Sequence, residues 1–272
     1  MPIRLLAVDL DGTLLTSGRV PHPDSAEAMR RAASAGVTVV LASGRIRTSM
    51  HPFAREVGLA SPMISCNGAY IEDETGAEID YTPLPMAVFE QVWPYAVETG
   101  AHLNVYTTTE LLYLQETVYG LEYARRLKTI QPRVATVEEV RNLTISKILV
   151  MDQPERIVKH RAILEDRIDP LLGRATVSEP DYLEFLSGDV SKGKALQTLC
   201  RHLGIAQEET AAIGDYLNDS EMLDWAGLSA TVRNGHPELH RIADVTVGTN
   251  DEGGVAEFID DHILSRKRCA AA

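Results

Sequence analysis

The sequence predicts an α/β protein, in which a parallel β-sheet covered by helices is interrupted by an inserted α+β unit. Apolar runs alternate with helical patterns from residue 3 to about residue 82, which is typical of parallel strands buried on both faces. The pattern changes over residues 83–187, and the alternation then resumes. We therefore expect a core domain built from residues 1–82 and 188–272, and an inserted domain built from residues 83–187.

The first part of the core is expected to contain three strands and two helices. The apolar runs assigned to strands are residues 3–10, 37–43 and 62–67, and helical spacing is found in residues 23–36 and 47–59. Ligands of such sheets lie beyond the carboxyl ends of the strands. Asp9, Ser43 and Asn67 should therefore lie near one another.

The insertion is expected to combine helices with short strands. Helices are assigned to residues 83–100 and 154–168, and strands to residues 102–107, 111–115, 146–151, 174–179 and 181–187. The core then resumes with helices over residues 191–204, 218–227 and 253–264, and strands over residues 210–215 and 228–233. The insertion thus has an α+β pattern of its own.

Composition and charge limit the classes of function. The 272 residues are sufficient for two domains, and the net charge of −13 provides no general attraction to nucleic acid or to an anionic membrane. Cys66, Cys200 and Cys269 are odd in number and lack the spacing of metal ligands, as expected in a reducing compartment. Because neither a signal-peptide pattern nor a long apolar run is present, we expect a cytoplasmic protein with a disordered tail over residues 265–272.

Two carboxylates follow the first apolar run, in the sequence DLDGTL. In an extended chain Asp9, Asp11 and Thr13 project to one side, and Gly12 allows the backbone to turn away sharply. Two negative charges this close repel each other unless a positive group lies between them. An isolated pair of this kind is also typical of an ordinary polar loop, so its meaning depends on the other motifs.

Two further motifs provide candidate phosphate-binding groups. Ser43 and Gly44 end a strand before a helix, where a hydroxyl and backbone amides form an anion site, although Ser43 could equally be a helix cap. Ser191 is expected to cap the next core helix, which places Lys192 in its first turn. A cation at a helix N-terminus interacts unfavourably with the helix dipole, which costs about 0.3–1 kcal/mol of stability. Lys192 is therefore poorly placed to stabilise the helix but well placed to bind a phosphate. A solvated surface lysine is the alternative, and Lys194 is the rival candidate.

The fourth motif, GDYLNDSEML, contributes Asp215, Asn218 and Asp219 after an apolar strand. Asn218 and Glu221 resemble a helix capping box, which would explain Asn218 and Asp219 but leaves Asp215 without a partner. Several carboxylate oxygens brought together are the ligands that Mg²⁺ prefers. The four motifs together therefore indicate a magnesium and phosphate site at the strand ends.

In this order along the chain, DLDGTLL, ASGR, VSKGKAL and GDYLNDSEML resemble the motifs of the haloacid dehalogenase superfamily. The chain is most similar to the Cof-type phosphatases of subfamily IIB, in which a C2-type cap lies between the second and third motifs. ISCNGAYI and ADVTVGTNDEGGVAEFI extend the resemblance, whereas Tyr216 departs from the glycine that many members have there. The resemblance implies a Rossmann-like three-layer core, with residues 83–187 as a cap that selects the substrate.

The resemblance also implies roles for the motif residues. Asp9 would be the nucleophile that forms an aspartyl-phosphate, and Asp11 the general acid and base, with a pKa high enough to carry a proton. Mg²⁺ would be held by the Asp9 carboxylate, the Asp11 backbone carbonyl and Asp215. The groups implied to bind phosphate oxygens are Ser43, the Gly44 amide, Lys192 and Asn218, with Asp219 orienting Lys192 or a metal-bound water and Thr13 steadying the loop.

The expected function is therefore a Mg²⁺-dependent phosphatase of small phosphorylated metabolites, such as sugar phosphates or phosphorylated cofactors. The alternatives are a phosphomutase on the same fold, a signalling receiver domain, which the large insertion disfavours, and a non-catalytic phosphate-binding protein. Candidates for substrate contact in the insertion are Tyr106, Arg126, Lys128, Tyr182, Glu184 and His102. Each is also explained as a packed or solvated side chain, and the sequence leaves the substrate and the oligomeric state open.

Overall fold

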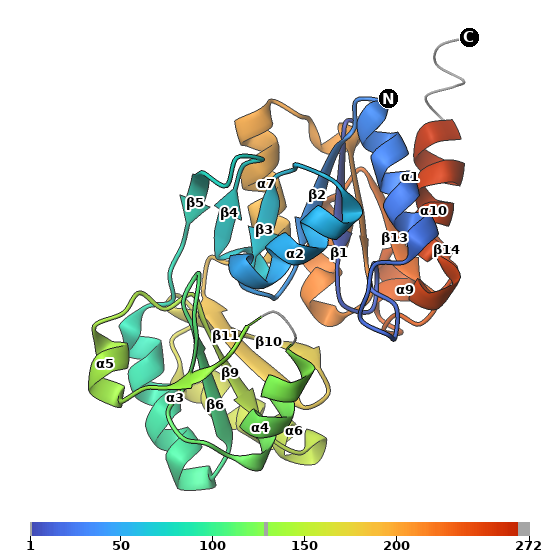
Figure 1. Cartoon of the computed structure of the whole chain (residues 1–272). Coiled ribbons are helices and arrows are strands. Elements are labelled where there is room, and N and C mark those ends of the chain that lie inside the picture. Colours follow the sequence, from blue (N-terminus) through green and yellow to red (C-terminus); the bar gives the residue numbers. More distant parts are fainter. Residues whose placement is uncertain (1, 128–129, 266–272) are drawn as a thin grey trace.

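The structure is a computed structural model, and it describes residues 2–127 and 130–265. Two β-sheets organise the chain (Figure 1). We call the part that holds the larger sheet the core unit, and the part between strand β5 and helix α7 the inserted unit. Three features considered in the sequence analysis lie outside the described residues, namely Lys128, Cys269 and the tail from residue 266 onward.

The sheet of the core unit has eight strands in the order β14-β13-β12-β1-β2-β3-β4-β5. The strands are β14 (Val245–Val247), β13 (Leu228–Val232), β12 (Thr210–Gly214), β1 (Leu5–Asp9), β2 (Thr38–Ala42), β3 (Met63–Ser65), β4 (Tyr70–Glu72) and β5 (Glu78–Tyr81). The pairings from β14 to β3 are parallel, as expected, whereas β4 and β5 pair antiparallel. The parallel sheet that the sequence predicts is therefore present, and an antiparallel hairpin that the sequence analysis did not assign extends it at this edge, since a hairpin needs only a short turn after β3.

Helices cover both faces of this sheet. They are α1 (Pro23–Ser34), α2 (Arg47–Val57), α7 (Lys192–Leu203), α8 (Ser220–Trp225), α9 (Leu239–Ile242) and α10 (Gly254–Phe258), the last continued by a π-helical segment, Ile259–Leu264. Side chains alternate along β1, so that Leu6 packs with α1, α2 and α10 while Leu5 packs with α7, α8 and α9. This arrangement is the three-layer α/β core that the sequence predicts.

The inserted unit has a sheet of six strands in the order β10-β11-β9-β6-β7-β8. Its strands are β6 (His102–Tyr106), β7 (Leu111–Tyr113), β8 (Arg133–Val134), β9 (Lys147–Met151), β10 (Gly173–Glu179) and β11 (Tyr182–Ser187), and its helices are α3 (Met86–Thr99), α4 (Val118–Arg126), α5 (Val137–Arg141) and α6 (Pro154–Arg167). Phe89 of α3 and Leu164 of α6 pack on one face. The opposite face carries Tyr106, Leu149 and Tyr182.

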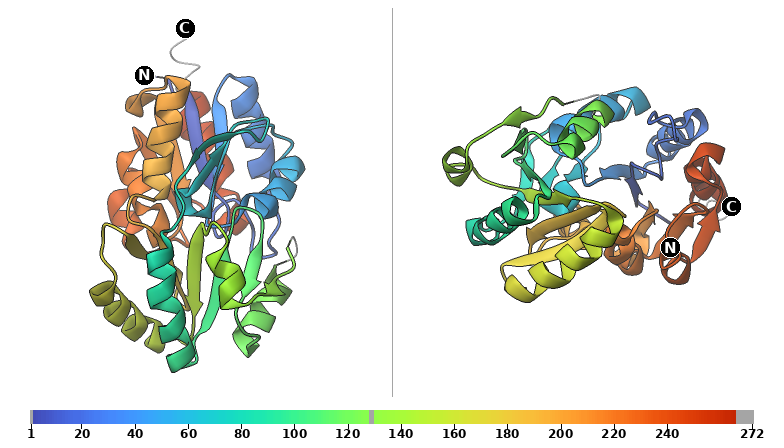
Figure 2. Two further views of the ribbon diagram at one scale, coloured as in Figure 1. Left: turned by 90° about the vertical axis from the view of Figure 1, so that its left-hand side faces the viewer. Right: turned by 90° about the horizontal axis from the view of Figure 1, so that it is seen from below.

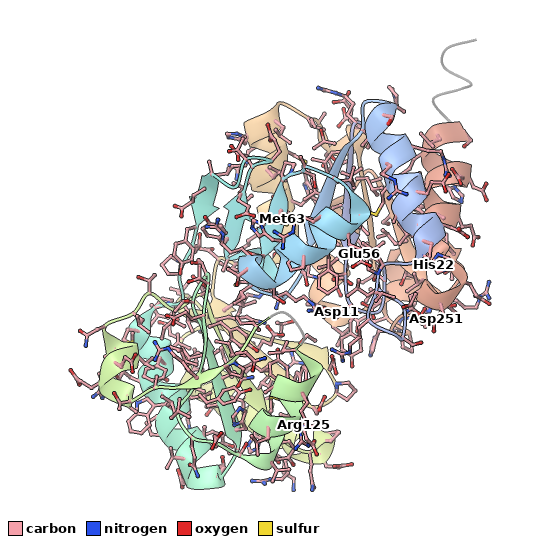
Figure 3. The ribbon with its side chains drawn as sticks, in the orientation of Figure 1. Asp11, His22, Glu56, Met63, Arg125 and Asp251 are labelled. Carbon is pink, nitrogen blue, oxygen red and sulfur yellow. The ribbon has the colours of Figure 1, made fainter. Side chains whose placement is uncertain are left out.

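The inserted unit leaves the core unit after β5 and returns just before α7, and it lies against one end of the core in all views (Figures 1 and 2). That end is the carboxyl edge of the parallel strands, where Asp11 is found facing the inserted unit (Figure 3). Within the described residues, none of the helices combines the length and apolar character needed to cross a membrane.

Candidate active site

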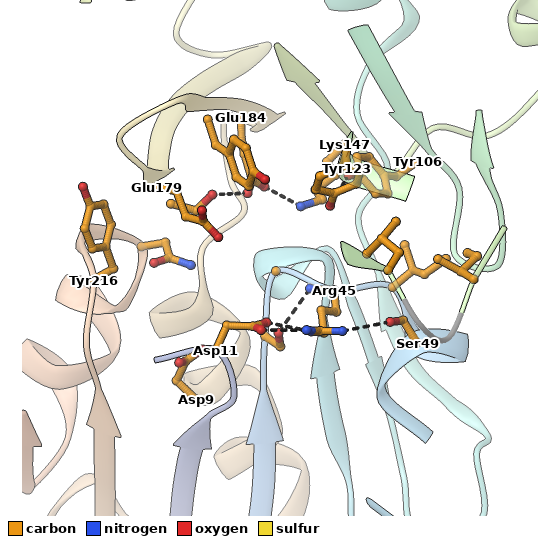
Figure 4. A pocket seen from close by; sticks show the side chains of 18 of the residues that line it. Asp9, Asp11, Arg45, Ser49, Tyr106, Tyr123, Lys147, Glu179, Glu184 and Tyr216 are labelled. Carbon is orange, nitrogen blue, oxygen red and sulfur yellow. Dashed lines mark hydrogen bonds and ion pairs between the residues drawn. The ribbon is translucent and has the colours of Figure 1, made fainter. Parts of the chain in front are cut away.

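A cavity of about 790 Å³, open to solvent, lies between the carboxyl ends of the core strands and the inserted unit (Figure 4). The core unit lines it with Asp9, Asp11, Ser43, Gly44, Arg45, Asp215 and Asn218, and the inserted unit with Tyr106, Tyr123, Lys147, Tyr182 and Glu184. The predicted motif residues of the core therefore meet at one place.

Asp9 is the last residue of β1 and is buried. Its Oδ1 accepts a hydrogen bond from Lys192 Nζ over 2.7 Å. Its Oδ2 is buried and has no hydrogen-bond partner among the described residues. Burial raises the pKa of Asp9 to about 7, opposed by the charge of Lys192 and assisted by that of Asp219. One carboxylate oxygen thus remains available for a ligand in the cavity.

Lys192 opens helix α7, whose cap is formed by the Ser191 hydroxyl accepting from the Lys194 amide over 3.1 Å. Lys192 Nζ lies between two carboxylates, 2.7 Å from Asp9 and 2.6 Å from Asp219. Burial alone would lower the pKa of Lys192, but Asp219 and Asp9 outweigh it and raise this pKa. The surface-lysine alternative is wrong for Lys192, whereas Lys194 is half exposed and pairs with Asp189.

Asp9, Asp215 and Asp219 each offer a carboxylate oxygen, and these oxygens lie within 4.8 Å of one another. Burial, together with the charges of Asp9 and Asp219, raises the pKa of Asp215 well above its ordinary value. Asp219 is already engaged, because Oδ1 accepts from Lys192 and Oδ2 accepts from the Asp215 amide over 3.0 Å. The residues that fit a hard divalent cation are therefore Asp9, with its unpartnered oxygen, and Asp215.

The loop after β1 brings Asp215 close to the first motif. Gly12 has a φ of +82°, and a Cβ atom at this residue would lie 2.2 Å from Asp215 Oδ2. Only glycine accommodates both the left-handed backbone and this approach. The buried Thr13 hydroxyl donates to Asp215 Oδ1 over 3.5 Å, so Thr13 contacts Asp215 rather than Asp9.

Asp11 lies at the cavity wall and forms a paired ion contact with Arg45. Arg45 Nε donates to Asp11 Oδ2 and a second guanidinium nitrogen donates to Oδ1, each over 2.6 Å. Burial alone would raise the pKa of Asp11, but the hydrogen bonds and charge of Arg45 hold this pKa below its ordinary value. The expectation of a raised pKa at Asp11 is therefore wrong in this conformation.

The predicted phosphate-binding groups surround the carboxylates. Helix α2 begins at Arg47 with Ile46 in the capping position, so Ser43 is not a helix cap, and its hydroxyl accepts from the Arg45 amide over 3.2 Å. Gly44 lies against Asn67, whose Oδ1 would be 3.0 Å from a Cβ at Gly44. Both Ser43 and Gly44 line the cavity.

Asn218 does not form the capping box considered for it. Its Nδ2 donates to Asn67 Oδ1 over 3.0 Å, and helix α8 begins only at Ser220. Glu221 instead accepts hydrogen bonds from Ser191 and Arg174. Contacts with distant parts of the chain have replaced the local capping interaction that the sequence pattern suggested.

The candidates of the inserted unit separate into two groups. Tyr106, Tyr182 and Glu184 line the cavity, whereas His102 is buried beside Asn104 and Thr117 within the inserted unit. The Arg126 side chain and Lys128 lie outside the described part of the structure. Tyr216 lines the cavity as well and packs edge-on against His236.

Sequence reasoning missed four charged residues of the cavity, which are Arg19, Arg45, Lys147 and Glu179. The sequence offered a signal for two of them, Arg45 and Lys147. Arg45 stands in the quoted motif ASGR, and its cationic side chain one residue after the anion-binding glycine was the available signal. Lys147 begins an otherwise apolar strand, SKILVM, where a charged residue is uncommon. Both signals are weak until the fold brings these residues to the carboxylates.

The structure thus combines a three-layer α/β core with a cluster of carboxylates and a buried lysine at its strand ends. The chain belongs to the haloacid dehalogenase-like hydrolases, a family that residues 6–259 match. The resemblance inferred from the four motifs is therefore confirmed.

Known proteins similar to this chain agree with that assignment. Pyridoxal phosphate phosphatase YbhA of Escherichia coli is 29% identical over 283 residues, covering 97% of this chain and 100% of its own. The 5-amino-6-(5-phospho-D-ribitylamino)uracil phosphatase YitU of Bacillus subtilis is 26% identical, covering 95% and 97%. A haloacid dehalogenase-like hydrolase of B. subtilis superimposes with a TM-score of 0.88 at 26% identity, covering 96% of this chain and 100% of that one.

Proposed function

We propose that the protein is a Mg²⁺-dependent phosphatase that hydrolyses phosphate monoesters of small metabolites through an aspartyl-phosphate. The observation that carries this proposal is the buried, unpartnered Oδ2 of Asp9. Asp9 lines the cavity together with Asp215, and its other carboxylate oxygen is paired with Lys192. A carboxylate so placed can attack a phosphorus atom that enters the cavity.

Asp9 and Asp215, with the backbone carbonyl of Asp11, would hold the metal ion. When bound, Mg²⁺ would neutralise the crowded carboxylates and the phosphate oxygens, so that two anions can approach each other. Lys192 would bind a non-bridging phosphate oxygen while remaining oriented by Asp219. Ser43, the Gly44 amide and Asn218 would complete the phosphate site, since they line the same wall of the cavity.

Asp9 attacks phosphorus, and the bond between phosphorus and the leaving alcohol oxygen breaks as Asp11 delivers a proton to that oxygen. Water then attacks the phosphorus of the aspartyl-phosphate, Asp11 takes its proton, and phosphate leaves with Asp9 restored. Asp11 is paired with Arg45 in this conformation. Arg45 lowers the pKa of Asp11, whereas the negative charge of a bound phosphate raises it. A bound phosphate therefore favours the protonated form of Asp11.

We further propose that residues 83–187 form the cap that selects the substrate, because they supply the wall of the cavity opposite the carboxylates. The names of two relatives support phosphorylated metabolites as substrates, since one acts on pyridoxal phosphate and the other on a phosphoribityl compound. A phosphomutase remains the second candidate from the sequence, and it is distinguished by transfer of the phosphoryl group to a sugar instead of water.

The first experiment measures phosphate release from a panel of phosphorylated metabolites, with and without Mg²⁺. It compares the wild type with Asp9→Asn and with Asp166→Asn, a substitution of the same kind at an exposed residue of α6. We expect phosphate release to require both Mg²⁺ and Asp9, and to be unchanged in Asp166→Asn. Release that persists in Asp9→Asn would exclude Asp9 as the nucleophile.

A second comparison addresses Asp11. We expect Asp11→Asn to slow the hydrolysis of alkyl phosphates more than the hydrolysis of aryl phosphates, because the departure of a poor leaving group depends most on its protonation. Equal turnover of an alkyl phosphate by wild type and Asp11→Asn would contradict the acid and base role.

A further inference from the structure

An ion pair in the inserted unit faces the cavity from the side opposite the carboxylates (Figure 4). Lys147, the first residue of β9, donates from Nζ to Glu184 of β11 over 2.5 Å. The side chains are only 3% and 4% exposed. Burying two charges is costly, so a pair at this place calls for a reason beyond stability.

The hydrogen-bonding capacity of Glu184 is used within the protein. Its Oε2 accepts from Lys147 and from Asn67 Nδ2, the latter over 2.7 Å, and its Oε1 accepts from Ser178. The carboxylate therefore holds Lys147 in place and has little capacity left for a ligand.

Lys147, in contrast, retains donor capacity. An ammonium group has three N–H donors, of which one is given to Glu184. The ring of Tyr106 lies 4.6 Å from Nζ and interacts with the positive charge. Because Lys147 lines the cavity, its remaining donor capacity is directed to whatever enters there.

A second donor lies on the same wall. The Tyr106 hydroxyl donates to the Tyr123 hydroxyl over 2.7 Å, so Tyr123 acts as the acceptor in this contact. The proton of the Tyr123 hydroxyl has no acceptor among the described residues, and Tyr123 lines the cavity. Lys147 and Tyr123 therefore offer donors to a ligand that carries acceptors, on a wall that also holds the carboxylates of Glu179 and Glu184.

We propose that Lys147 is a specificity-determining residue, which binds a neutral oxygen acceptor, a hydroxyl or carbonyl, on the alcohol part of the substrate. This inference rests on the proposed phosphatase function. The acceptor is neutral because Glu184 already balances the charge of Lys147. A carboxylate on the leaving group would bring a second, unbalanced negative charge next to Glu184.

Asn67 fixes the distance between this subsite and the phosphate site. Its Nδ2 donates to Glu184, and its Oδ1 accepts from Asn218, so contacts run from Lys147 to the predicted phosphate-binding residues. Asn67 has a left-handed backbone with φ of +56° and is buried. The next residue, Gly68, packs so closely that a Cβ would lie 2.3 Å from the Ser191 carbonyl. Asn67 is thus a positioning residue.

The test compares kcat/KM for three kinds of phosphate monoester. Glucose 6-phosphate and pyridoxal 5′-phosphate carry neutral hydroxyl or carbonyl oxygens, 2-phosphoglycolate carries a carboxylate and no hydroxyl, and phenyl phosphate has no acceptor on its leaving group. We expect Lys147→Met to lower kcat/KM for at least one of the neutral oxygen-bearing esters about tenfold or more, mainly through KM. The kcat/KM for phenyl phosphate should change by less than about twofold, since its leaving group offers Lys147 no acceptor to contact.

Because Lys147→Met leaves Glu184 buried without its cation, the double variant Lys147→Met/Glu184→Gln is measured beside it. It leaves no buried charge at these two positions, and its melting temperature reports whether the fold is intact. The loss for the oxygen-bearing ester should persist in this variant. Asn67→Gly, which suits the left-handed backbone, should reduce the preference for oxygen-bearing esters over phenyl phosphate.

Three outcomes would overturn the proposal. An equal loss for all esters would mean that Lys147 only supports the structure, and no loss for any ester would mean that Lys147 contacts no substrate. Wild-type preference for 2-phosphoglycolate over both neutral oxygen-bearing esters would exclude a neutral oxygen acceptor. Failure of the proposed function is distinct, because then no ester, phenyl phosphate included, would release phosphate in an Asp9-dependent way.

Discussion

Arg45 holds both carboxylate oxygens of Asp11, with two hydrogen bonds of 2.6 Å each. The contact is the paired geometry in which a guanidinium and a carboxylate interact most strongly. It holds the pKa of Asp11 below its ordinary value, although Asp11 must carry a proton to assist a leaving alcohol. If Asp11 is the general acid as proposed, we expect Arg45 to set the pH range in which leaving-group protonation is effective.

Replacing Arg45 by Met should move the alkaline limb of the pH profile to higher pH. Without the guanidinium, the pKa of Asp11 rises, so that its protonated form persists further into the alkaline range. The measurement is kcat/KM against pH for an alkyl phosphate. Arg55→Met, at an exposed site near the end of α2, is the control and should leave the profile in place. An unchanged pH profile in Arg45→Met would show that Arg45 does not influence the protonation of Asp11.

Replacing Lys192 by Met should abolish turnover and destabilise the fold near neutral pH. The substitution removes the cation between Asp9 and Asp219, and loss of one partner of a buried ion network costs about 3–5 kcal/mol. Lys194→Met on the same helix should cost less than about 1 kcal/mol, because Lys194 forms an exposed pair. Urea unfolding of both variants checks the difference, and equal stabilities would contradict the buried network.

Replacing Gly12 by Ala should weaken Mg²⁺ binding about tenfold or more, because the added Cβ would displace Asp215 from a distance of 2.2 Å. Gly36→Ala is the matched control. Gly36 has a similar φ of +79° but nothing within 4 Å of an added Cβ, so only backbone strain of about 1–2 kcal/mol is expected. Titration of each variant with Mg²⁺ tests this pair, and retained affinity in Gly12→Ala would place the metal elsewhere.

Mg²⁺ should stabilise the protein more at alkaline than at acidic pH. Burial raises the pKa of Asp9 to about 7 and the pKa of Asp215 well above normal, so the folded state binds more protons than the unfolded state in this window. The metal-free protein therefore loses stability as pH rises from about 4 through 7, by up to about 1.4 kcal/mol per pH unit for each group.

A divalent cation competes with these protons and relieves the repulsion that remains when they leave. Melting temperatures measured at about pH 5 and about pH 8, with and without MgCl₂, should show the larger increase at the higher pH. The double variant Asp9→Asn/Asp215→Asn should lose this dependence. An increase of equal size at both pH values would mean that Mg²⁺ binds away from these carboxylates.

The main strands of the core could be predicted because each buries a long apolar run. Residues 3–10 are an example, and β1 lies within them with every residue buried. The hairpin partner β5 was not predicted, since it has only four residues, two of them acidic, and β14 has only three residues. Such short edge strands are stabilised by pairing with a neighbour that the local sequence does not reveal.

The candidate site could be predicted where neighbouring residues carry the signal, as in DLDG, which places Asp9 and Asp11 two residues apart. Arg45 with Asp11 and Lys147 with Glu184 are separated by 34 and 37 residues, and only the folded chain pairs them. Glu221 illustrates the opposite failure, because a local capping pattern was replaced by contacts with Arg174 and Ser191.

The inserted unit is joined to the core by two short connections, one between Tyr81 and Met86 and the other between Ser187 and Lys192. For protein engineering, this makes residues 83–187 a cassette with two adjacent splice points. Exchange with the equivalent segment of a relative would transplant the wall that meets the alcohol while leaving Asp9, Asp215 and Lys192 in the host. The second splice point requires the most care, because it runs directly into the helix that begins with Lys192.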